Sequence, residues 1–155
     1  MNVGDTFPEF RLPDENGEIF DSSSLAGLRY IIYFYSKDGT PGCTREAEDF
    51  NGRYVKFMMM NIPIIGVSRD SSGSHDKFRQ KYGLKMKLLS DANAELMKEA
   101  RVWGKKKNYG KEYEGTIRST FVVGKDGRIE ALWTKVKVDG HVAEVNDMIK
   151  TLNRQ

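Results

Sequence analysis

Cysteine and histidine are scarce in this chain of 155 residues. Cys43 is the only cysteine, which excludes a scaffold held by internal disulfides and a metal site built from several thiolates. The two histidines, His75 and His141, are far apart in the sequence and lack the spacing of paired metal ligands. We therefore expect neither a bound metal nor any other cofactor.

Long apolar segments and a strong net charge are also absent. The chain has no run of about 18 apolar residues, and Met1–Asp5 does not resemble the start of a signal peptide, so we expect a cytoplasmic protein without membrane contact. The formal net charge of +3 is too small to indicate a nucleic-acid partner. Lys105-Lys106-Lys107 lies near Trp103 and Tyr109, but no nucleic-acid-binding motif surrounds it, and we predict a solvated loop there.

The overall composition is that of an ordinary globular chain. Hydrophobic residues make up 39% and charged residues 30% of the sequence, and no low-complexity tract, repeat or linker interrupts it. A chain of this length is long enough to bury a core of two or three layers. We predict a single domain that includes residues 1–155.

Turn residues and apolar runs predict the elements of the first half. Asp14-Glu15-Asn16-Gly17 is a turn signal within Phe10–Asp21 and predicts an N-terminal β-hairpin. The aromatic and β-branched run Tyr30–Tyr35 predicts a buried strand, and the apolar spacing of Glu46–Met60 predicts a helix. The nearly continuous apolar run Ile62–Ser68 is typical of an interior strand.

The same signals predict an alternation of helices and strands in the second half. We expect helices over Ser74–Tyr82, Ala92–Ala100 and His141–Leu152, and strands over Lys87–Leu89, Phe121–Val123 and Arg128–Thr134. Ser90 or Asp91 is expected to cap the second of these helices, and Lys125-Asp126-Gly127 predicts a hairpin between the last two strands. This order indicates an α/β fold with a mixed central sheet and helices on both faces.

Cys43 lies between the predicted buried strand and the helix that follows. Most lone cysteines in small proteins are inert buried side chains, and that interpretation is the simpler one. Here, however, a turn containing Pro41 and Gly42 leads directly to Cys43, which places the sulfur in the first helical turn. Unpaired amides and the positive end of the helix dipole favour a thiolate at that position. The sequence therefore favours a reactive thiol.

Two separate blocks of sequence resemble those of a known family. The segment from Tyr33 to Ala47, with Thr40-Pro41-Gly42-Cys43-Thr44 at its centre, resembles the active-site signature of peroxiredoxins, and it is most similar to the bacterioferritin comigratory protein or peroxiredoxin Q subfamily. Gly115–Val123 resembles the block that supplies that family's active-site arginine, here Arg118. The resemblance extends over nearly the whole chain and implies a thioredoxin-like fold.

The chain departs from that family at two positions. Ser36 stands where family members usually carry a proline that shields the reactive sulfur from water. Many relatives have a second cysteine five residues after the first, where this chain has Glu48, and others place it on a later helix. Because Cys43 has no partner cysteine, the resemblance is to a single-cysteine (1-Cys) member that cannot form an internal disulfide.

The resemblance assigns candidate roles to the residues around Cys43. Arg118, which stays protonated, would donate to the sulfur and to a peroxide oxygen, although a lone arginine is often only a surface charge. Thr40 would donate to and accept from the peroxide, or serve as a helix cap. The amides of Gly42 and Cys43 would supply further donors, and Pro41 would fix the turn.

Two further residues each have two candidate roles. Glu46 is either a carboxylate favoured at a helix start or a partner that orients an arginine. Tyr35 is expected to border the pocket, but an aromatic residue in a buried strand more often belongs to the core. Both are retained as supporting candidates for the site.

These features predict a thiol-dependent peroxidase. Cys43 would reduce hydrogen peroxide or an organic hydroperoxide and become a sulfenic acid, which an external thiol such as thioredoxin, glutaredoxin or a small thiol would recycle. The alternative is a non-enzymatic redox sensor or binding module in which oxidised Cys43 alters an interface. We expect a monomer or a weak homodimer.

Overall fold

The computed structural model describes residues 1–155, apart from the side chain of residue 108. Its central sheet has the strand order β5-β4-β3-β8-β9, in which β3, β4 and β5 are mutually parallel and β8 and β9 are antiparallel neighbours. The strands are β3 (Tyr30–Phe34), β4 (Ile64–Ser68), β5 (Lys87–Ser90), β8 (Ser119–Val123) and β9 (Ile129–Trp133). The predicted mixed sheet and its strands are confirmed.

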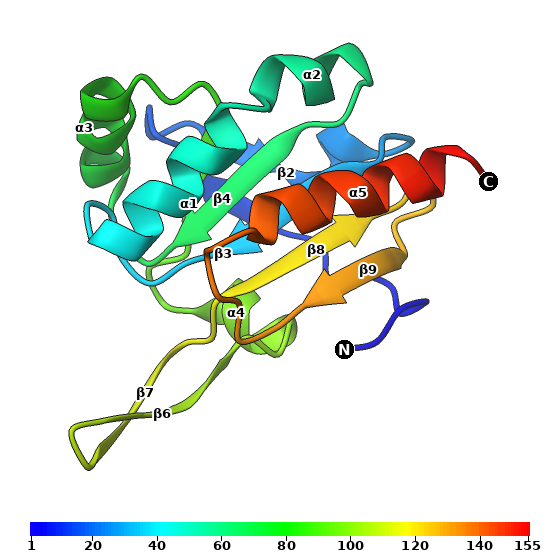
Figure 1. Ribbon diagram of the computed structural model, residues 1–155. Helices are drawn as coiled ribbons and strands as arrows, with labels where there is room; N and C mark the ends of the chain where they lie inside the picture. Colours follow the sequence, from blue (N-terminus) through cyan, green and yellow to red (C-terminus); the bar gives the residue numbers. More distant parts are fainter.

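Helices cover both faces of this sheet (Figure 1). On one face, α1 (Pro41–Asn51), α2 (Tyr54–Met59), α3 (Ser72–Tyr82) and α5 (His141–Asn153) contribute side chains to a single buried cluster. On the other face, α4 (Glu95–Glu99) and the N-terminal segment form a second cluster. The expected arrangement of helices on both faces is confirmed.

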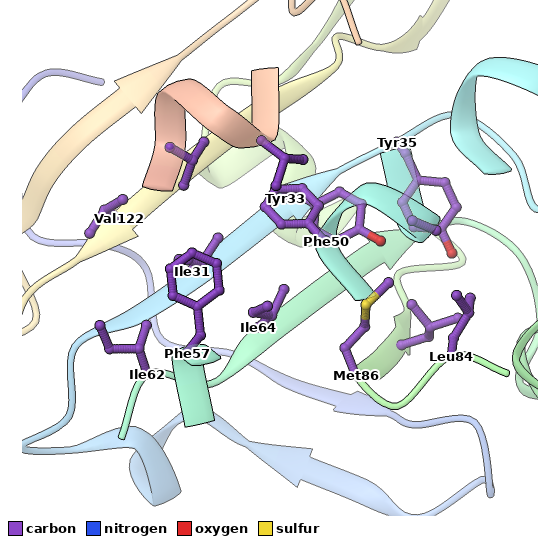
Figure 2. Close-up of a cluster of buried hydrophobic side chains, with 14 of the residues drawn as sticks. Ile31, Tyr33, Tyr35, Phe50, Phe57, Ile62, Ile64, Leu84, Met86 and Val122 are labelled. Atoms are coloured by element: carbon purple, nitrogen blue, oxygen red, sulfur yellow. The ribbon is translucent and has the colours of Figure 1, made fainter. Parts of the chain in front are cut away.

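The central strand β3 explains how the two clusters are joined. All five of its residues are buried, and their side chains alternate between the two faces. Ile31 and Tyr33 belong to the first cluster, whereas Ile32 and Phe34 belong to the second. Figure 2 shows Tyr33 beside Phe50 of α1, and their stacked ring centroids are 4.5 Å apart. This packing holds α1 against the strand that precedes it.

Two hairpins lie outside the central sheet. The first pairs β1 (Arg11–Pro13) with β2 (Ile19–Asp21), as expected for the turn signal at residues 14–17, and leads into the short 3-10 helix η1 (Ser22–Leu25). The second pairs β6 (Trp103–Asn108) with β7 (Lys111–Thr116) and extends away from the body of the protein (Figure 1).

The solvated loop predicted at Lys105–Lys107 was wrong, because these residues lie in β6. Lysine and glycine are poor strand formers, which is why their run gave no strand signal. The hairpin depends on its two-residue turn, where Tyr109 and Gly110 have φ values of 51° and 78°. Positive φ at both positions is the geometry of a type I′ turn, which suits the twist of paired strands.

Two predicted helices have different bounds in the structure. The helix expected over Glu46–Met60 is divided into α1 and α2, because the chain leaves helical geometry around Gly52 and Arg53. The helix expected over Ala92–Ala100 is shortened to α4. The expected capping role of Asp91 is confirmed, since its carboxylate accepts from the amides of Leu96 at 3.3 Å and Met97 at 2.9 Å. Among the described residues, no helix is long and apolar enough to cross a membrane.

Candidate active site

The first turn of α1 determines the position of Cys43. The chain leaves β3, passes through residues 35–40 and enters the helix at Pro41, with Thr40 as the N-cap residue in extended geometry. Cys43 therefore lies in the first helical turn, as predicted, and only 2% of its surface is exposed. The amides of Gly42 and Cys43 have no partner within the helix, because the first turn lacks preceding carbonyls. A negatively charged sulfur is favoured at this helix end.

Arg118 connects Cys43 to a buried carboxylate. It lies between β7 and β8, and its Nη2 donates to the Cys43 Sγ at 3.2 Å. Its Nη1 donates to the Glu46 Oε1 at 2.6 Å, one turn further along α1. The structure thus brings three of the candidate residues into direct contact across a sequence separation of more than seventy residues. The guanidinium is oriented by Glu46 and directed at the sulfur.

Burial and neighbouring charges together set the pKa values of Glu46 and Arg118. Burial raises the pKa of Glu46 to about 7, and the adjacent Arg118 guanidinium opposes that rise. Burial alone would lower the pKa of Arg118, but the charges of Glu46 and Cys43 outweigh it, so the pKa of the guanidinium is raised. Arg118 therefore remains a cation beside the sulfur throughout the neutral range.

The hydroxyl of Thr40 faces its own loop rather than the helix. Thr40 occupies the N-cap position, yet its side chain makes no capping hydrogen bond. Instead, its Oγ1 donates to the Lys37 carbonyl at 2.9 Å. We expected this hydroxyl both to donate to and to accept from a peroxide. Because its hydrogen is directed at Lys37, the geometry supports the acceptor role.

We expect Thr40→Val to slow the reaction of Cys43 with peroxide by at least about tenfold, because the substrate loses a group that orients it. The rate of alkylation by iodoacetamide, a neutral reagent that needs no such orientation, should change much less. Stopped-flow peroxide reduction and alkylation assays measure the two rates. Thr40→Ser, which retains the hydroxyl, is the matched control. Equal losses in both reactions of Thr40→Val would show that Thr40 has only a structural role.

Tyr35 belongs to the core side of the site. Its ring packs on Tyr33 and Phe78, with centroids 5.6 Å and 6.5 Å away, and 1% of its surface is exposed. Its hydroxyl donates to the Asp38 Oδ1 at 2.5 Å and not to the Cys43 sulfur. Tyr35 therefore contributes to the loop before the helix, while Pro41 and Gly42 form the start of the helix itself.

Sequence reasoning missed a buried network that holds this loop. The Asp38 carboxylate accepts from Tyr35 through Oδ1 and from Ser74 through Oδ2, the latter at 2.8 Å. Its Oδ2 also lies 2.7 Å from the Nδ1 of His75, a fully buried residue of α3. The backbone amide of Asp38 donates to the Asp70 Oδ2 at 2.9 Å. We call these five residues the Asp38 clamp.

The ring of His75 connects the Asp38 carboxylate to β5. Its Nε2 lies 2.9 Å from the Leu89 carbonyl oxygen, which can only accept, and its Nδ1 faces the Asp38 carboxylate. The imidazole therefore bridges the Asp38 carboxylate and the carbonyl of Leu89 in β5. Burial would raise the pKa of Asp38, but the hydrogen bonds from His75 and Tyr35 outweigh it and lower that pKa. The loop that carries Thr40 is thus anchored to α3 and β5.

His141, the first residue of α5, is neutral and buried near Arg118. Its Nε2 lies 2.7 Å from the Thr120 Oγ1, and 3% of its surface is exposed. Burial, aided by the positive charge of Arg118, lowers the pKa of His141 from 6.5 to about 4. Between these pH values the unfolded chain binds more protons than the folded chain. The contribution of neutral, buried His141 to folding stability is therefore complete above pH 6.5 and is lost as the pH falls toward 4.

We expect His141→Gln to weaken the dependence of the unfolding free energy on pH. The difference in unfolding free energy between pH 6.5 and pH 4 should be smaller in the variant by about 3 kcal/mol, because the lost protonation step corresponds to that amount. Urea denaturation at several pH values measures it. Glu46 and the other titrating groups are present in both proteins, so their contributions cancel in the comparison. An identical pH dependence in the two proteins would contradict the assignment.

The mixed sheet of this chain is that of the thioredoxin-like peroxiredoxin fold, and Cys43 lies buried where its first long helix begins. The chain belongs to the AhpC/TSA family, whose family model matches residues 3–132. It is a thiol-dependent peroxidase enzyme, as predicted.

Individual relatives agree with this assignment. The chain is 42% identical over 155 residues to the peroxiredoxin Bcp of Bacillus subtilis, covering 100% of this chain and 99% of that protein. A solved cysteine-to-serine variant of Xylella fastidiosa peroxiredoxin Q is 37% identical, with a TM-score of 0.93 over 99% of this chain and 98% of its own. The bacterioferritin comigratory protein of Xanthomonas campestris is 39% identical, with a TM-score of 0.87 over 92% and 90% of the two chains.

These relatives confirm the predicted subfamily and the thioredoxin-like fold. The single cysteine of this chain fits the 1-Cys form of the family. The alternative of a non-enzymatic redox sensor or binding module gains no support from them.

Proposed function

We propose that Cys43 is the peroxidatic nucleophile, with Arg118 and Thr40 as catalytic residues and Pro41, Gly42, Glu46 and Tyr35 as supporting residues. The observation that carries this proposal is the double contact of Arg118, which touches the sulfur and is held by Glu46. A guanidinium in that position stabilises the thiolate and is available to the oxygen on which charge develops.

The first step of the proposed reaction is the transfer of one peroxide oxygen to sulfur. The Cys43 thiolate attacks the terminal oxygen of ROOH, the O–O bond breaks, and the leaving alkoxide takes a proton to become ROH, or water when the substrate is hydrogen peroxide. Cys43 is thereby oxidised to a sulfenic acid. Organic hydroperoxides are included because the Xanthomonas campestris relative is described for its alkyl peroxide reduction activity.

The second step of the proposal is reduction by an external thiol. One thiol condenses with the sulfenic acid to give a mixed disulfide and water. A second thiol then attacks the mixed disulfide, which releases Cys43 as a thiol and forms a disulfide between the two external thiols. Thioredoxin, glutaredoxin and small thiols are the proposed reductants, since the chain has no second cysteine of its own. Such chemistry suits a reducing compartment, so we propose a cytoplasmic location.

The proposal includes a single domain and little or no self-association. Residues 1–155 form one domain in this proposal, because both buried clusters pack on the same central sheet. We propose a monomer or a weak homodimer, since the exposed large apolar side chains on α2, Val55, Met58 and Met59, form too small a group for an obligate interface.

Peroxide consumption with candidate reductants tests the proposed function. Without added thiol, one equivalent of peroxide should leave a sulfenic acid that dimedone traps, and excess peroxide should convert it to the sulfinic acid. With thioredoxin, glutaredoxin or a small thiol, many equivalents should be consumed per chain. Consumption of only one equivalent with every reductant would contradict the catalytic proposal and support a sensor. Mass spectrometry of the intact protein follows the oxidation state of Cys43.

A further inference from the structure

A cleft beside the active site has no role in the mechanism above. It encloses about 360 Å³ between the β6–β7 hairpin and residues 36–37 of the loop before Cys43. Lys37, Arg69 and Lys106 contribute their positive charges to its lining. The aromatic ring of Trp103 lies beneath one of them, with the Arg69 guanidinium 5.1 Å from the ring centroid. Its volume is within the range of small-molecule sites.

The carboxylates of the cleft are already hydrogen-bonded. Asp70 accepts from the Ser68 hydroxyl at 2.6 Å, in addition to its bond with the Asp38 amide. Glu114 accepts from the Trp103 Nε1 at 3.4 Å. Three cations against these two carboxylates leave a formal excess of one positive charge in the lining. The cleft therefore favours an anionic ligand.

Lys106 is held in place within the cleft. Its aliphatic chain lies across Gly115, where an added Cβ would come within 3.1 Å of the lysine Cδ. Its ammonium donates to the Thr116 carbonyl at 2.9 Å and to the Ser36 hydroxyl at 3.5 Å. A lysine has three donor hydrogens, so one remains for a ligand. The Ser36 hydroxyl therefore helps to fix the ammonium at this edge of the cleft.

Two residues that line the cleft are connected to residues of the candidate site. On one side, the carbonyl of Lys37 accepts the hydroxyl of Thr40. On the other side, Thr116 precedes Arg118 by two residues, and Arg118 contacts Cys43. A molecule with its anionic end at Lys106 would lie against the loop that carries Thr40 and the segment that carries Arg118.

We propose that this cleft binds the carboxylate of a small anionic thiol and presents its sulfhydryl to oxidised Cys43. This inference rests on the proposed function. A small thiol is favoured over a protein thiol because the cleft, at about 360 Å³, has the volume of a small-molecule site. The bound thiol attacks the sulfenic sulfur, the sulfur–oxygen bond breaks, and water leaves as the mixed disulfide forms. A second thiol then attacks the mixed disulfide, which returns Cys43 to its reduced form and releases the small disulfide.

The test compares an anionic thiol with a neutral one on the preformed sulfenic acid. Mercaptosuccinate and 2-mercaptoethanol are reacted with protein oxidised by one equivalent of peroxide, and the second-order rate constants are measured by stopped flow. We expect the ratio of the mercaptosuccinate to the 2-mercaptoethanol rate constant to fall about fivefold in Lys106→Gln, which corresponds to about 1 kcal/mol. The intrinsic reactivities of the two thiols cancel when the wild type and the variant are compared.

Lys105→Gln is the matched control, because Lys105 adjoins Lys106 on β6 but is not among the residues that line the cleft. This variant should keep the wild-type ratio. Lys37→Gln should lower the ratio too, which provides a second variant if Lys106→Gln does not fold. An unchanged ratio in folded Lys106→Gln, or an equal fall in Lys105→Gln, would overturn the proposal. Failure of the wild type to form a sulfenic acid would instead refute the proposed function.

Discussion

Replacing Cys43 by serine is expected to reduce peroxide consumption by at least about a thousandfold, since a serine hydroxyl is not ionised at neutral pH and is a poor nucleophile toward peroxide oxygen. The fold should remain, because serine is nearly isosteric with cysteine and Cys43 lies at the edge of the first buried cluster beside Arg118. Peroxide consumption with a saturating reductant measures the loss. Circular dichroism and thermal unfolding establish that the variant is folded.

Trapping by dimedone separates this outcome from a general loss of activity. The wild type should incorporate the reagent after one equivalent of peroxide, and Cys43→Ser should not. Because Cys43 is the only cysteine, no other thiol can account for the label. Substantial turnover in folded Cys43→Ser would mean that the reacting group lies elsewhere in the chain.

Replacing Arg118 by methionine is expected to slow the peroxide step by about a hundredfold to a thousandfold, the usual loss when a charged or oriented donor is removed from a reacting centre. The variant loses the donor to the Cys43 sulfur and leaves Glu46 buried without its cation. The ionised fraction of the thiol should fall as well. Stopped-flow reduction of hydrogen peroxide and the ultraviolet absorbance of the thiolate measure the two effects.

Arg45→Met is the matched control for this experiment. Arg45 also lies on α1, but its guanidinium is largely exposed and pairs with Asp139. The Arg45→Met variant should retain nearly the wild-type rate of peroxide reduction, since a surface ion pair contributes little to stability. Rates that fall equally in both variants would show that Arg118 acts through net charge rather than through its contact with the sulfur. Rescue in Arg118→Lys should be partial, because an ammonium lacks the two-pronged geometry of guanidinium.

Much of the central sheet could be predicted from local patterns. Tyr30–Phe34 and Ile64–Ser68 are buried on both faces, so their apolar runs are continuous and unambiguous. The final helix has a single apolar stripe with Val145 and Ile149 at its centre, and its observed bounds differ from the prediction by one residue at its end. In these elements the local preference and the tertiary environment agree.

The elements that escaped prediction depend on weak local signals. Strands β6 and β7 carry the lysine run and two glycines, Gly104 and Gly115, and the pairing between the two strands holds the hairpin together. The break between α1 and α2 is also invisible to periodicity, because the apolar spacing continues on both sides of Gly52. Boundaries of this kind are settled by packing rather than by propensity.

The candidate site also combines residues that a local motif predicts with residues that no local pattern predicts. Thr40, Pro41, Gly42 and Cys43 are neighbours in one motif, so their place at a helix start could be inferred from the sequence. The position of Arg118 against Cys43 followed only from the resemblance to a family, since 75 residues separate the two. The Asp38–His75 pair was missed because its partners are 37 residues apart and no local pattern links them.

The Asp38 clamp has a consequence for how the protein opens. Since Asp38 is bonded to α3 by its side chain and to Asp70, just after β4, by its amide, the loop before Cys43 belongs to the same cooperative unfolding unit as the sheet. Native-state hydrogen exchange at the Asp38 amide should therefore follow the slow exchange of the core strands rather than the fast exchange of surface loops. A perturbation that leaves the sheet intact should also leave the Asp38 clamp intact.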